Sequence, residues 1–420
     1  MGDFVVFVSG GLPGEECRVG LREVHRHYAL AEVETITTSS PDRVVPPCPV
    51  FGACGGCQWQ MLSYPAQLRA KSQLVTEALE RIGGLKDPQV EPTVGMDDPW
   101  RFRNKAQFPV SSRDGKVAMG YYRRGTHEVV EFEACAIQGP ALDRVRNAFK
   151  ALWETHRLPV YDERSRAPGL RHIVARVGQG TGEVLVMLVL SRGSVPAHLI
   201  EEARKALPEM VGLALNHNSR PGNVILGERF TLLWGRGHFF ETIAPLRLKV
   251  SAGSFFQTNS RQTEALYRKA SEMAGLSGRE RVVDLYSGVG GIALFLAPQA
   301  QSVLGIEEVT QAHRDACENK ALNRIRNVEF RCGRAEQHLY VLGKAEILIA
   351  DPPRSGCSMK VLSAIARSEI RRLVYVSCNP TTLARDTQFL CSQGFRLSRV
   401  VPVDLFPHSF HVETVARLDR

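Results

Sequence analysis

The sequence contains no long apolar run. Nowhere in its 420 residues does an apolar stretch approach the roughly 20 residues that a helix needs to cross a bilayer. The first residues, Met1–Phe7, also lack the basic start and extended apolar core of a secretion signal. These absences argue against a membrane-spanning or secreted protein, so we expect a cytoplasmic one with no membrane partner.

Internal repeats and low-complexity tracts are missing as well. Hydrophobic residues make up 44% of the chain and charged residues 23%, which is ordinary for a globular protein. A chain of 420 residues is too long for one typical core and long enough for two or three domains. Nothing in the sequence reports the oligomeric state, and we assume a monomer.

Acidic residues are fewer than basic ones, and the imbalance is uneven. Lys and Arg total 53 against 44 Asp and Glu, a net charge of +9. Residues 101–176 contain 15 basic and 8 acidic residues and so hold most of that excess. Basic surface with interleaved rings suits unpaired RNA, although a solvated basic face over core aromatics explains the pattern equally well. The rings concerned are Trp100, Phe102, Phe108, Tyr121 and Tyr122.

The chain divides by pattern into three stretches. Residues 1–43 contain short apolar strands separated by glycine-rich turns, which predicts a small β unit. Residues 44–250 begin with a cysteine-containing loop and a helix over Ala66–Ile82, and continue with alternating strand patterns. Residues 251–420 alternate apolar strands with helices, which predicts a doubly wound parallel sheet. Its expected strands are Val282–Leu285, Ser302–Glu307, Ala345–Ala350 and Leu373–Ser377.

A glycine-rich loop follows the first of these strands and opens a helix. Within residues 284–291, Gly288 and Gly290 let the backbone approach a ligand closely. Glu307 ends the next strand, where a carboxylate can accept hydrogen bonds from both ribose hydroxyls. The loop alone is weak evidence, because structural turns and nicotinamide or flavin sites have similar glycines. Its spacing differs from G-x-G-x-x-G, however, and resembles the loop of class I methyltransferases.

Four other segments carry a more specific resemblance. They are Phe255-Phe256-Gln257-Thr258-Asn259, Asp351-Pro352-Pro353-Arg354-x-Gly356, Ser377-Cys378-Asn379-Pro380 and the segment from Val403 to Glu413. Together they closely resemble the signatures of the RNA uracil-C5 methyltransferase family, and the likeness spans almost the whole chain. This resemblance implies a class I, Rossmann-like domain that uses S-adenosylmethionine and acts on RNA.

The chemistry of this family explains the residue types. Uracil C5 is a poor nucleophile until a thiolate adds to C6, and a base must later remove the C5 proton. The resemblance implies that Cys378 is the nucleophile and Glu413 the general base. It also implies a set of cofactor-binding residues: Gln257, Tyr286, Gly288, Gly290, Glu307 and Asp351.

The residues alone leave two alternative functions open. Asp-Pro-Pro segments also occur in methyltransferases that act on nitrogen atoms, which need no cysteine nucleophile. A non-catalytic RNA-binding or assembly factor on the same fold is the second alternative. The presence of both Cys378 and Glu413 counts against each of them.

Three closely spaced cysteines and one distant cysteine form a candidate metal site. Cys48, Cys54 and Cys57 lie in a Gly/Pro-rich loop, and Cys135 follows later. Four thiols suit either zinc or an iron–sulfur cluster, and the spacing does not decide between them. The ribosomal-RNA branch of the resembled family carries a [4Fe-4S] cluster on this pattern. The resemblance therefore implies a structural [4Fe-4S] cluster and 23S ribosomal RNA as substrate, with transfer RNA as the alternative.

The sequence departs from the family pattern at two places. Residues 1–43 resemble the TRAM β-barrel of many members, but the first strand is missing, so we expect a truncated barrel. Arg334 stands where many methyltransferases have an acidic or amide residue that meets adenine, and Glu336 or a backbone group would have to serve instead. The predicted fold is an α/β class I methyltransferase domain with a central iron–sulfur α+β domain and a truncated TRAM-like barrel.

Overall fold

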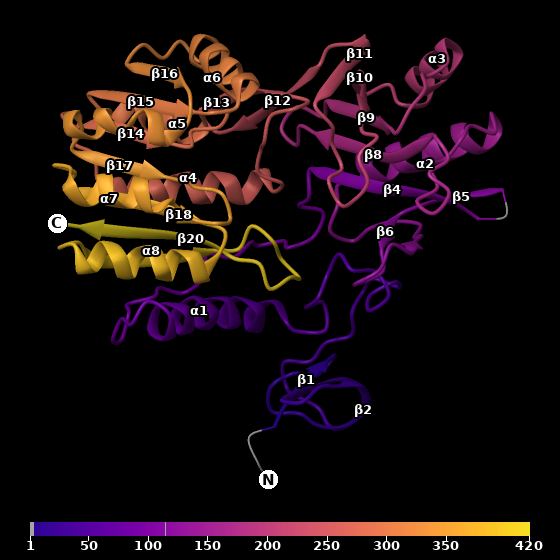
Figure 1. The fold of residues 1–420 in the computed structure, drawn as a ribbon, viewed down its shortest axis with the longest axis horizontal. Helices are drawn as coiled ribbons and strands as arrows, with labels where there is room; N and C mark the ends of the chain where they lie inside the picture. Colours follow the sequence, from indigo (N-terminus) through magenta and orange to yellow (C-terminus); the bar gives the residue numbers. More distant parts are fainter. Residues whose placement is uncertain (1–3, 114) are drawn as a thin grey trace.

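The computed structural model describes residues 4–113 and 115–420. Two large sheets dominate the molecule, one of seven strands and one of six. Figure 1 shows the seven-stranded sheet with its helices on the left, the six-stranded sheet at the upper right and the N-terminal strands at the bottom. No helix in the described ranges combines the length and the apolar character that crossing a bilayer requires.

The C-terminal part of the chain forms the seven-stranded sheet. Its strand order is β16-β15-β14-β17-β18-β20-β19; the first five strands are parallel, and β20 is antiparallel to both neighbours. This arrangement confirms the predicted alternation of strands and helices and adds an antiparallel edge. The strands are β14 (Arg281–Leu285), β15 (Ser302–Glu307), β16 (Val328–Cys332), β17 (Ile347–Ala350), β18 (Arg372–Ser377), β19 (Arg396–Val403) and β20 (Glu413–Asp419).

Helices cover both faces of this sheet, because its parallel strands are apolar on both sides. Along β17, Ile347 and Ile349 belong to the core on one face and Leu348 to the core on the other. The first face packs against α4, α5 and α6, and the second against α7 and α8. These helices are α4 (Ser260–Ala274), α5 (Gly291–Leu296), α6 (Thr310–Leu322), α7 (Met359–Arg367) and α8 (Pro380–Ser392), with 3-10 turns at Ala297–Gln299, Ala335–Gln337 and Leu339–Lys344.

A helix from much earlier in the chain, α1 (Tyr64–Arg81), packs beside α8 on the second face (Figure 1). Its buried residues Val75 and Leu79 join the core that α7 and α8 form. Downstream of α1, isolated bridges tie Val90 and Val94 to β19. The segment after the cysteine loop is therefore docked on the C-terminal sheet, although it precedes the central sheet in the sequence.

The six-stranded sheet has the order β11-β10-β9-β8-β4-β5, with β9 and β10 parallel and the other pairs antiparallel. Helices α2 and α3 pack against one of its faces, and β8 and β9 are buried along their whole lengths. The elements are β4 (Lys105–Arg113), β5 (Lys116–Met119), α2 (Pro140–Thr155), β8 (Leu170–Val177), β9 (Val184–Leu190), α3 (Ala197–Ala206), β10 (Met210–His217) and β11 (Arg229–Gly235).

Two short hairpins flank this sheet. The first is β6 (Tyr121–Tyr122) with β7 (Val129–Val130). The second, β12 (His238–Ile243) with β13 (Leu246–Ser251), leads into the C-terminal part of the chain. Strand β13 packs on α6, so this hairpin connects the two large sheets.

The N-terminal residues form a small separate sheet of three strands in the order β1-β3-β2. Its strands are β1 (Val5–Ser9), β2 (Glu16–Val24) and β3 (Tyr28–Thr38), with β1 parallel to β3. Residues 4–43 thus contain the predicted strands as an open sheet, and residues 1–3 of the predicted unit lie outside the described residues. The likeness to a TRAM barrel and the three-domain division stay predictions.

Candidate active site

The carboxyl ends of the parallel strands gather the predicted site residues at one edge of the sheet. Tyr286 follows β14, Glu307 ends β15, and Asp351 follows β17. Cys378 follows β18, and Glu413 begins the antiparallel strand β20 at the same edge. Open α/β sheets bind ligands at this edge, in the crevice outside the carboxyl ends of their strands. Residues predicted from separate motifs therefore meet in one place.

Cys378 and Glu413 lie across from each other on neighbouring strands. The antiparallel register of β18 and β20 ends at the pair Ser377 and Thr414, Cys378 and Glu413 are the residues directly beyond that pair, and the Glu413 carboxyl acts electrostatically on the Cys378 thiol. Directly opposed residues in such a ladder have Cβ atoms about 4.5–5.5 Å apart, with side chains on one face. Glu413 is only 3% exposed, and its Oε2 atom has no hydrogen-bond partner among the described residues. A thiol beside a buried, unpartnered carboxyl group is suited to a reaction that moves protons.

Burial raises the pKa of the acidic groups at this edge. It raises the pKa of the Cys378 thiol to about 11, and the neighbouring Glu413 and Asp351 carboxyls add to the rise. It also raises the pKa of Glu413 well above its usual range, with a further contribution from Asp351. The pKa of Asp351 is raised to about 7 by burial. Arg354 partly opposes the rise in the pKa of Cys378. The Cys378 thiol is therefore protonated at rest. The raised pKa of Glu413 also favours its protonated form, and its carboxylate form is a stronger base than an ordinary carboxylate.

Asp284, near the end of β14, belongs to the same edge, although it was not among the residues predicted to bind the cofactor. Its side chain is 1% exposed, and neither carboxyl oxygen has a hydrogen-bond partner among the described residues. Burial raises its pKa well above the usual range and Asp351 adds to the rise, while the backbone N–H of Ala293, which is near the carboxyl group but outside hydrogen-bond geometry, partly offsets it. A buried carboxyl group without partners points to a cation or donor that binds there. Its place directly before the glycine loop was the available signal.

The loop after β14 turns sharply at three residues. Tyr286, Gly288 and Gly290 have φ angles of 68°, 55° and 85°. At Gly290 a Cβ atom would lie 2.7 Å from the ring of Phe330, so a side chain there would clash. Around Gly288 nothing lies within 4 Å of the corresponding Cβ position, so its backbone is open to a ligand. At Tyr286 the left-handed backbone stores about 1–3 kcal/mol of strain, which surrounding packing must hold.

A cleft of about 790 Å³ opens beside this loop and is large enough for a nucleoside-sized ligand. Tyr286, Glu307 and Asp351 line it. Arg334, to which the sequence assigned no adenine contact, and Glu336, which was named as an alternative, line it as well. The Glu336 carboxylate already accepts a hydrogen bond from a serine hydroxyl at 2.7 Å, which fixes its position at the wall of the cleft.

Both carboxylate oxygens of Glu307 accept backbone hydrogen bonds. The Oε2 atom accepts from the amide of Gly288 at 2.8 Å, and the Oε1 atom accepts from the amide of Val309 at 2.7 Å. Each oxygen keeps further acceptor capacity. The two bonds orient the carboxylate at the cleft, where it is ready to accept hydrogen bonds from a pair of vicinal hydroxyls.

Gln257 lies in the loop before α4 and is 9% exposed. The side-chain amide of Asn104 donates to the backbone carbonyl of Gln257 at 3.0 Å and to the Ser260 hydroxyl at 2.8 Å. Asn104 directly precedes β4, so this contact ties the six-stranded sheet to the loop before α4. Gln257 is not part of the lining of the cleft that Tyr286 and Glu307 form.

Sequence comparison finds relatives over the whole chain. An RNA methyltransferase of Bacillus cereus is 42% identical over 99% of this chain and 92% of that protein. Another, from Caldanaerobacter subterraneus, is also 42% identical, over 99% of this chain and 93% of the relative. The family model described as tRNA (Uracil-5-)-methyltransferase matches residues 339–420, which include Cys378 and Glu413. This chain belongs to the RNA uracil-C5 methyltransferase family.

A solved structure supports the same assignment for this RNA methyltransferase. It is the tRNA (uracil-54, C5)-methyltransferase of Pyrococcus abyssi, in complex with S-adenosyl-L-homocysteine. The two chains are 28% identical, with a TM-score of 0.79 over 98% of this chain and 95% of the other. This agreement confirms the predicted α/β methyltransferase fold.

The four cysteines of the predicted cluster surround one small cavity in this methyltransferase. Cys48, Cys54, Cys57 and Cys135 line it together with apolar and aromatic side chains. Burial raises the pKa of the Cys57 thiol to about 12 and that of Cys135 to about 11, and nearby thiols add to both rises. Within residues 4–113 and 115–420, no group of three or more potential ligands is arranged to hold a metal ion. The four cysteines are the right donors for a four-thiolate site. Their sulfur atoms are not arranged closely around a single ion, however, and the iron–sulfur cluster stays a prediction.

Two rings proposed from the sequence as stacking surfaces belong to the interior of this methyltransferase. Phe102 and Phe108 are 1% and 0% exposed, because they pack among buried residues beside β4. For these two rings the core explanation is correct and the RNA explanation is wrong. Two exposed rings were missed: Phe255 precedes the Gln257 segment at 66% exposure, and Phe410 precedes β20 at 44% exposure.

Proposed function

We propose that this protein transfers a methyl group from S-adenosylmethionine to C5 of a uridine in RNA, through a covalent bond between Cys378 and C6 of the uracil ring. The observation that carries the proposal is the position of Cys378 beside the buried Glu413 carboxyl at the carboxyl edge of the sheet, just beyond the last pair of β18 and β20. A nitrogen methyltransferase would need neither residue. A non-catalytic RNA-binding factor would not need a buried, unpartnered carboxyl group beside a partly accessible thiol.

The reaction assigns one step to each residue. The Cys378 thiol, which is partly exposed, gives its proton to water, and its sulfur adds to C6, which makes C5 electron-rich. C5 then attacks the methyl group, so that the new carbon–carbon bond forms as the bond between the methyl group and the cofactor sulfur breaks and S-adenosylhomocysteine leaves. The Glu413 carboxylate then takes the C5 proton, the double bond between C5 and C6 re-forms, and the sulfur leaves. A raised pKa at Glu413 favours this last proton transfer, because a carboxylate with a high pKa is a better base.

The cleft fits S-adenosylmethionine, which supplies the methyl group from a positively charged sulfur. Asp284 and Asp351 are carboxyls whose pKa values are raised, and the orphaned oxygens of Asp284 suit a bound cation such as the methionine ammonium group. Glu307 would hold the ribose hydroxyls, and Tyr286 would contact the cofactor. Gly288 and Gly290 let the loop come close, and we assign Gln257 to the junction of uracil and cofactor.

We propose further that Cys48, Cys54, Cys57 and Cys135 hold a [4Fe-4S] cluster that stabilises the region around it. The convergence of four thiols on one cavity supports this assignment. An iron–sulfur cluster separates its ligand sulfurs more widely than a single zinc ion does, so a cavity between them suits it better. Nothing in the methyl transfer requires the cluster to change its oxidation state.

As the RNA substrate we propose 23S ribosomal RNA, bound over the basic central stretch of the chain, residues 44–250. The cysteine set supports this choice, because it resembles the pattern of the ribosomal-RNA branch. Transfer RNA is the second candidate, since the solved relative from Pyrococcus abyssi is named for uridine 54 of tRNA.

The purified protein should be incubated with radiolabelled S-adenosylmethionine and, separately, with 23S ribosomal RNA and transfer RNA that lack 5-methyluridine. We expect 5-methyluridine in the ribosomal RNA alone, and none with the Cys378→Ala protein. Label in transfer RNA alone would replace the substrate proposal. Label on a nitrogen atom, or none in either RNA with cofactor-binding protein, would overturn the proposed function itself.

A further inference from the structure

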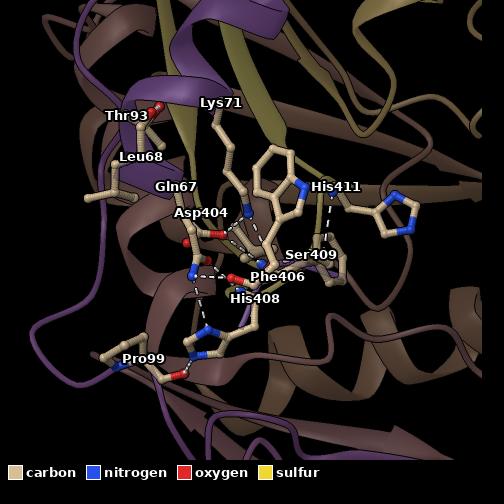
Figure 2. Close-up of polar contacts among 12 residues, drawn as sticks. Gln67, Leu68, Lys71, Thr93, Pro99, Asp404, Phe406, His408, Ser409 and His411 are labelled. Atoms are coloured by element: carbon tan, nitrogen blue, oxygen red, sulfur yellow. Dashed lines mark hydrogen bonds and ion pairs between the residues drawn. The ribbon is translucent and has the colours of Figure 1, made fainter. Parts of the chain in front are cut away.

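A fully buried ion pair joins α1 to the C-terminal hairpin that carries Glu413. Lys71 and Asp404 are both 0% exposed, and the Lys71 Nζ atom donates to the Asp404 Oδ1 atom at 2.5 Å (Figure 2). The same Nζ atom donates to the backbone carbonyl of Phe406 at 2.9 Å. Burying two charges is costly, and such pairs are better explained by the geometry they impose than by stability alone.

Asp404 lies at the mouth of the hairpin, directly behind the predicted base. Val403, the last residue of β19, pairs with Glu413, the first residue of β20, so residues 404–412 form the connection between them. Asp404 also accepts a hydrogen bond from the Tyr64 hydroxyl of α1 at 2.9 Å. Fixing Asp404 therefore fixes the point at which the strand bearing Glu413 begins.

A second set of contacts holds the tip of the same hairpin. The side-chain carbonyl of Gln67 accepts from the backbone amide of His408 at 2.8 Å. The amides of Gln58 and Trp59 both donate to the carbonyl of His408 at 2.9 Å. His408 has a φ of 65°, so this backbone conformation depends on its surroundings. Gln58 directly follows Cys57, which links the cysteine loop to the hairpin.

We propose that Lys71 is a positioning residue for the elimination step: with Gln67, Gln58 and Trp59 it forms a latch that sets the place of Glu413 relative to the reacting uracil. The inference rests on the proposed function. Cys378 has additional support outside the hairpin, because Asn379, the next residue, caps α8 and donates to the carbonyl of Arg354 at 3.2 Å. A shifted hairpin should therefore impair proton removal by Glu413 more than attack by Cys378.

The test separates these two steps in a Lys71→Met protein. RNA with 5-fluorouridine traps the covalent complex after addition and methyl transfer, because fluorine cannot be removed as a proton. We expect the trapping rate to stay within about threefold of wild type, while turnover on ordinary RNA falls by about tenfold or more. Covalent complex with ordinary uridine should accumulate, and the apparent affinity for S-adenosylmethionine should not change.

Arg69→Met is the matched control, because Arg69 lies on the same helix and its ion pair with Asp42 is largely exposed. It should turn over at the wild-type rate and accumulate no complex. Since Lys71→Met leaves a buried carboxyl group unpaired, its thermal unfolding is measured beside wild type. If it does not fold, Gln67→Leu decides, because this variant introduces no unpaired charge and should separate the two rates in the same direction.

A folded latch variant in which trapping and turnover fall equally, or in which neither changes, would contradict the positioning role. The wild-type protein and Glu413→Gln accompany every series. If wild type neither makes 5-methyluridine nor traps fluorinated RNA, the proposed function has failed. If wild type does both and only the latch variants behave unexpectedly, the failure belongs to the latch.

Discussion

Cys378 and Cys57 are similarly weak acids, but different chemical groups surround them. Burial raises the pKa of Cys378 to about 11 and that of Cys57 to about 12. Cys378 is partly exposed at the edge of a sheet, next to two carboxyl groups, Glu413 and Asp351. Cys57 lines a small cavity together with Cys48, Cys54 and Cys135, and these thiols add to the rise in its pKa.

The comparison teaches that the proton partners of a cysteine, rather than its own pKa, indicate its chemistry. A thiol with a raised pKa is a poor nucleophile at rest in either place. Of these two thiols, Cys378 has a buried carboxyl group beside it that we propose as the base, and Cys57 has three further thiols around its cavity, which together with its own make the number of sulfur donors that a four-thiolate metal site requires. The predictions below test whether this difference in surroundings separates a reacting thiol from structural ones.

The largest effect should come from Cys378→Ala. Removing the attacking sulfur should lower methyl transfer by about 10⁴-fold or more, since no other group can activate C5. Binding of S-adenosylmethionine, measured by calorimetry, should not change, because the cleft is lined by other residues. Turnover within tenfold of wild type would show that Cys378 is another structural thiol.

The next largest effect should come from Glu413→Gln, which keeps the shape of the side chain and removes the base. We expect turnover to fall by about 10²–10⁴-fold. Because addition and methyl transfer still occur, the methylated RNA should stay bonded to the protein and appear as a slow band on a denaturing gel. A variant that is slow but forms no bonded RNA would place Glu413 before the methyl transfer.

Cys57→Ala should produce a smaller loss of activity with a different signature. We expect iron and acid-labile sulfide to disappear from anaerobically purified protein, and turnover to fall by about 10–100-fold through loss of support for the surrounding region. Cys317→Ala, at an exposed cysteine far from both groups in the sequence, is the control and should change neither quantity. Zinc without iron in the wild-type protein would eliminate the cluster assignment.

The smallest effect should be electrostatic. The negative charge of Asp351 raises the pKa of the Cys378 thiol, so Asp351→Asn should lower that pKa. Only the thiolate is alkylated, so at pH 8 iodoacetamide should modify Cys378 faster in the variant, by up to about tenfold. In wild type the rate should still be rising at pH 9, below the pKa of about 11. Peptide mass spectrometry measures Cys378 separately from other cysteines; a slower reaction in the variant would reverse the assigned sign.

Much of the C-terminal fold could be predicted because its signals are local. The strand Ser302–Glu307 was predicted with both ends correct, since an apolar run ends at a pair of acidic residues, Glu307 and Glu308. The docking of α1 on α8 could not be predicted, because Val75 and Leu79 reveal a buried face but not the partner it packs against. The sequence did not decide whether Phe102 and Phe108 lie in the interior or on the surface, because an aromatic ring in a basic stretch suits both places.

Part of the active site could be predicted, because separate sequence motifs each place one functional residue at the end of a strand in the seven-stranded sheet. Cys378 and Glu413 come from separate segments, and only the register of β18 and β20 makes them neighbours. Asp284 was not assigned a role, although it directly precedes the glycine loop, because its lack of hydrogen-bond partners is visible only in the structure. The Lys71–Asp404 pair was missed because its members are 333 residues apart and neither stands in a motif that requires the other.

The most direct test of the account is to locate the bond between protein and RNA. The protein is incubated with S-adenosylmethionine and RNA that contains 5-fluorouridine, the complex is digested, and the modified peptide is sequenced by mass spectrometry. The account predicts a methylated fluorouracil attached to the sulfur of Cys378, and no attachment at Cys48, Cys54, Cys57 or Cys135. A bond to any other residue, or methylated RNA formed without a trapped complex, would contradict it.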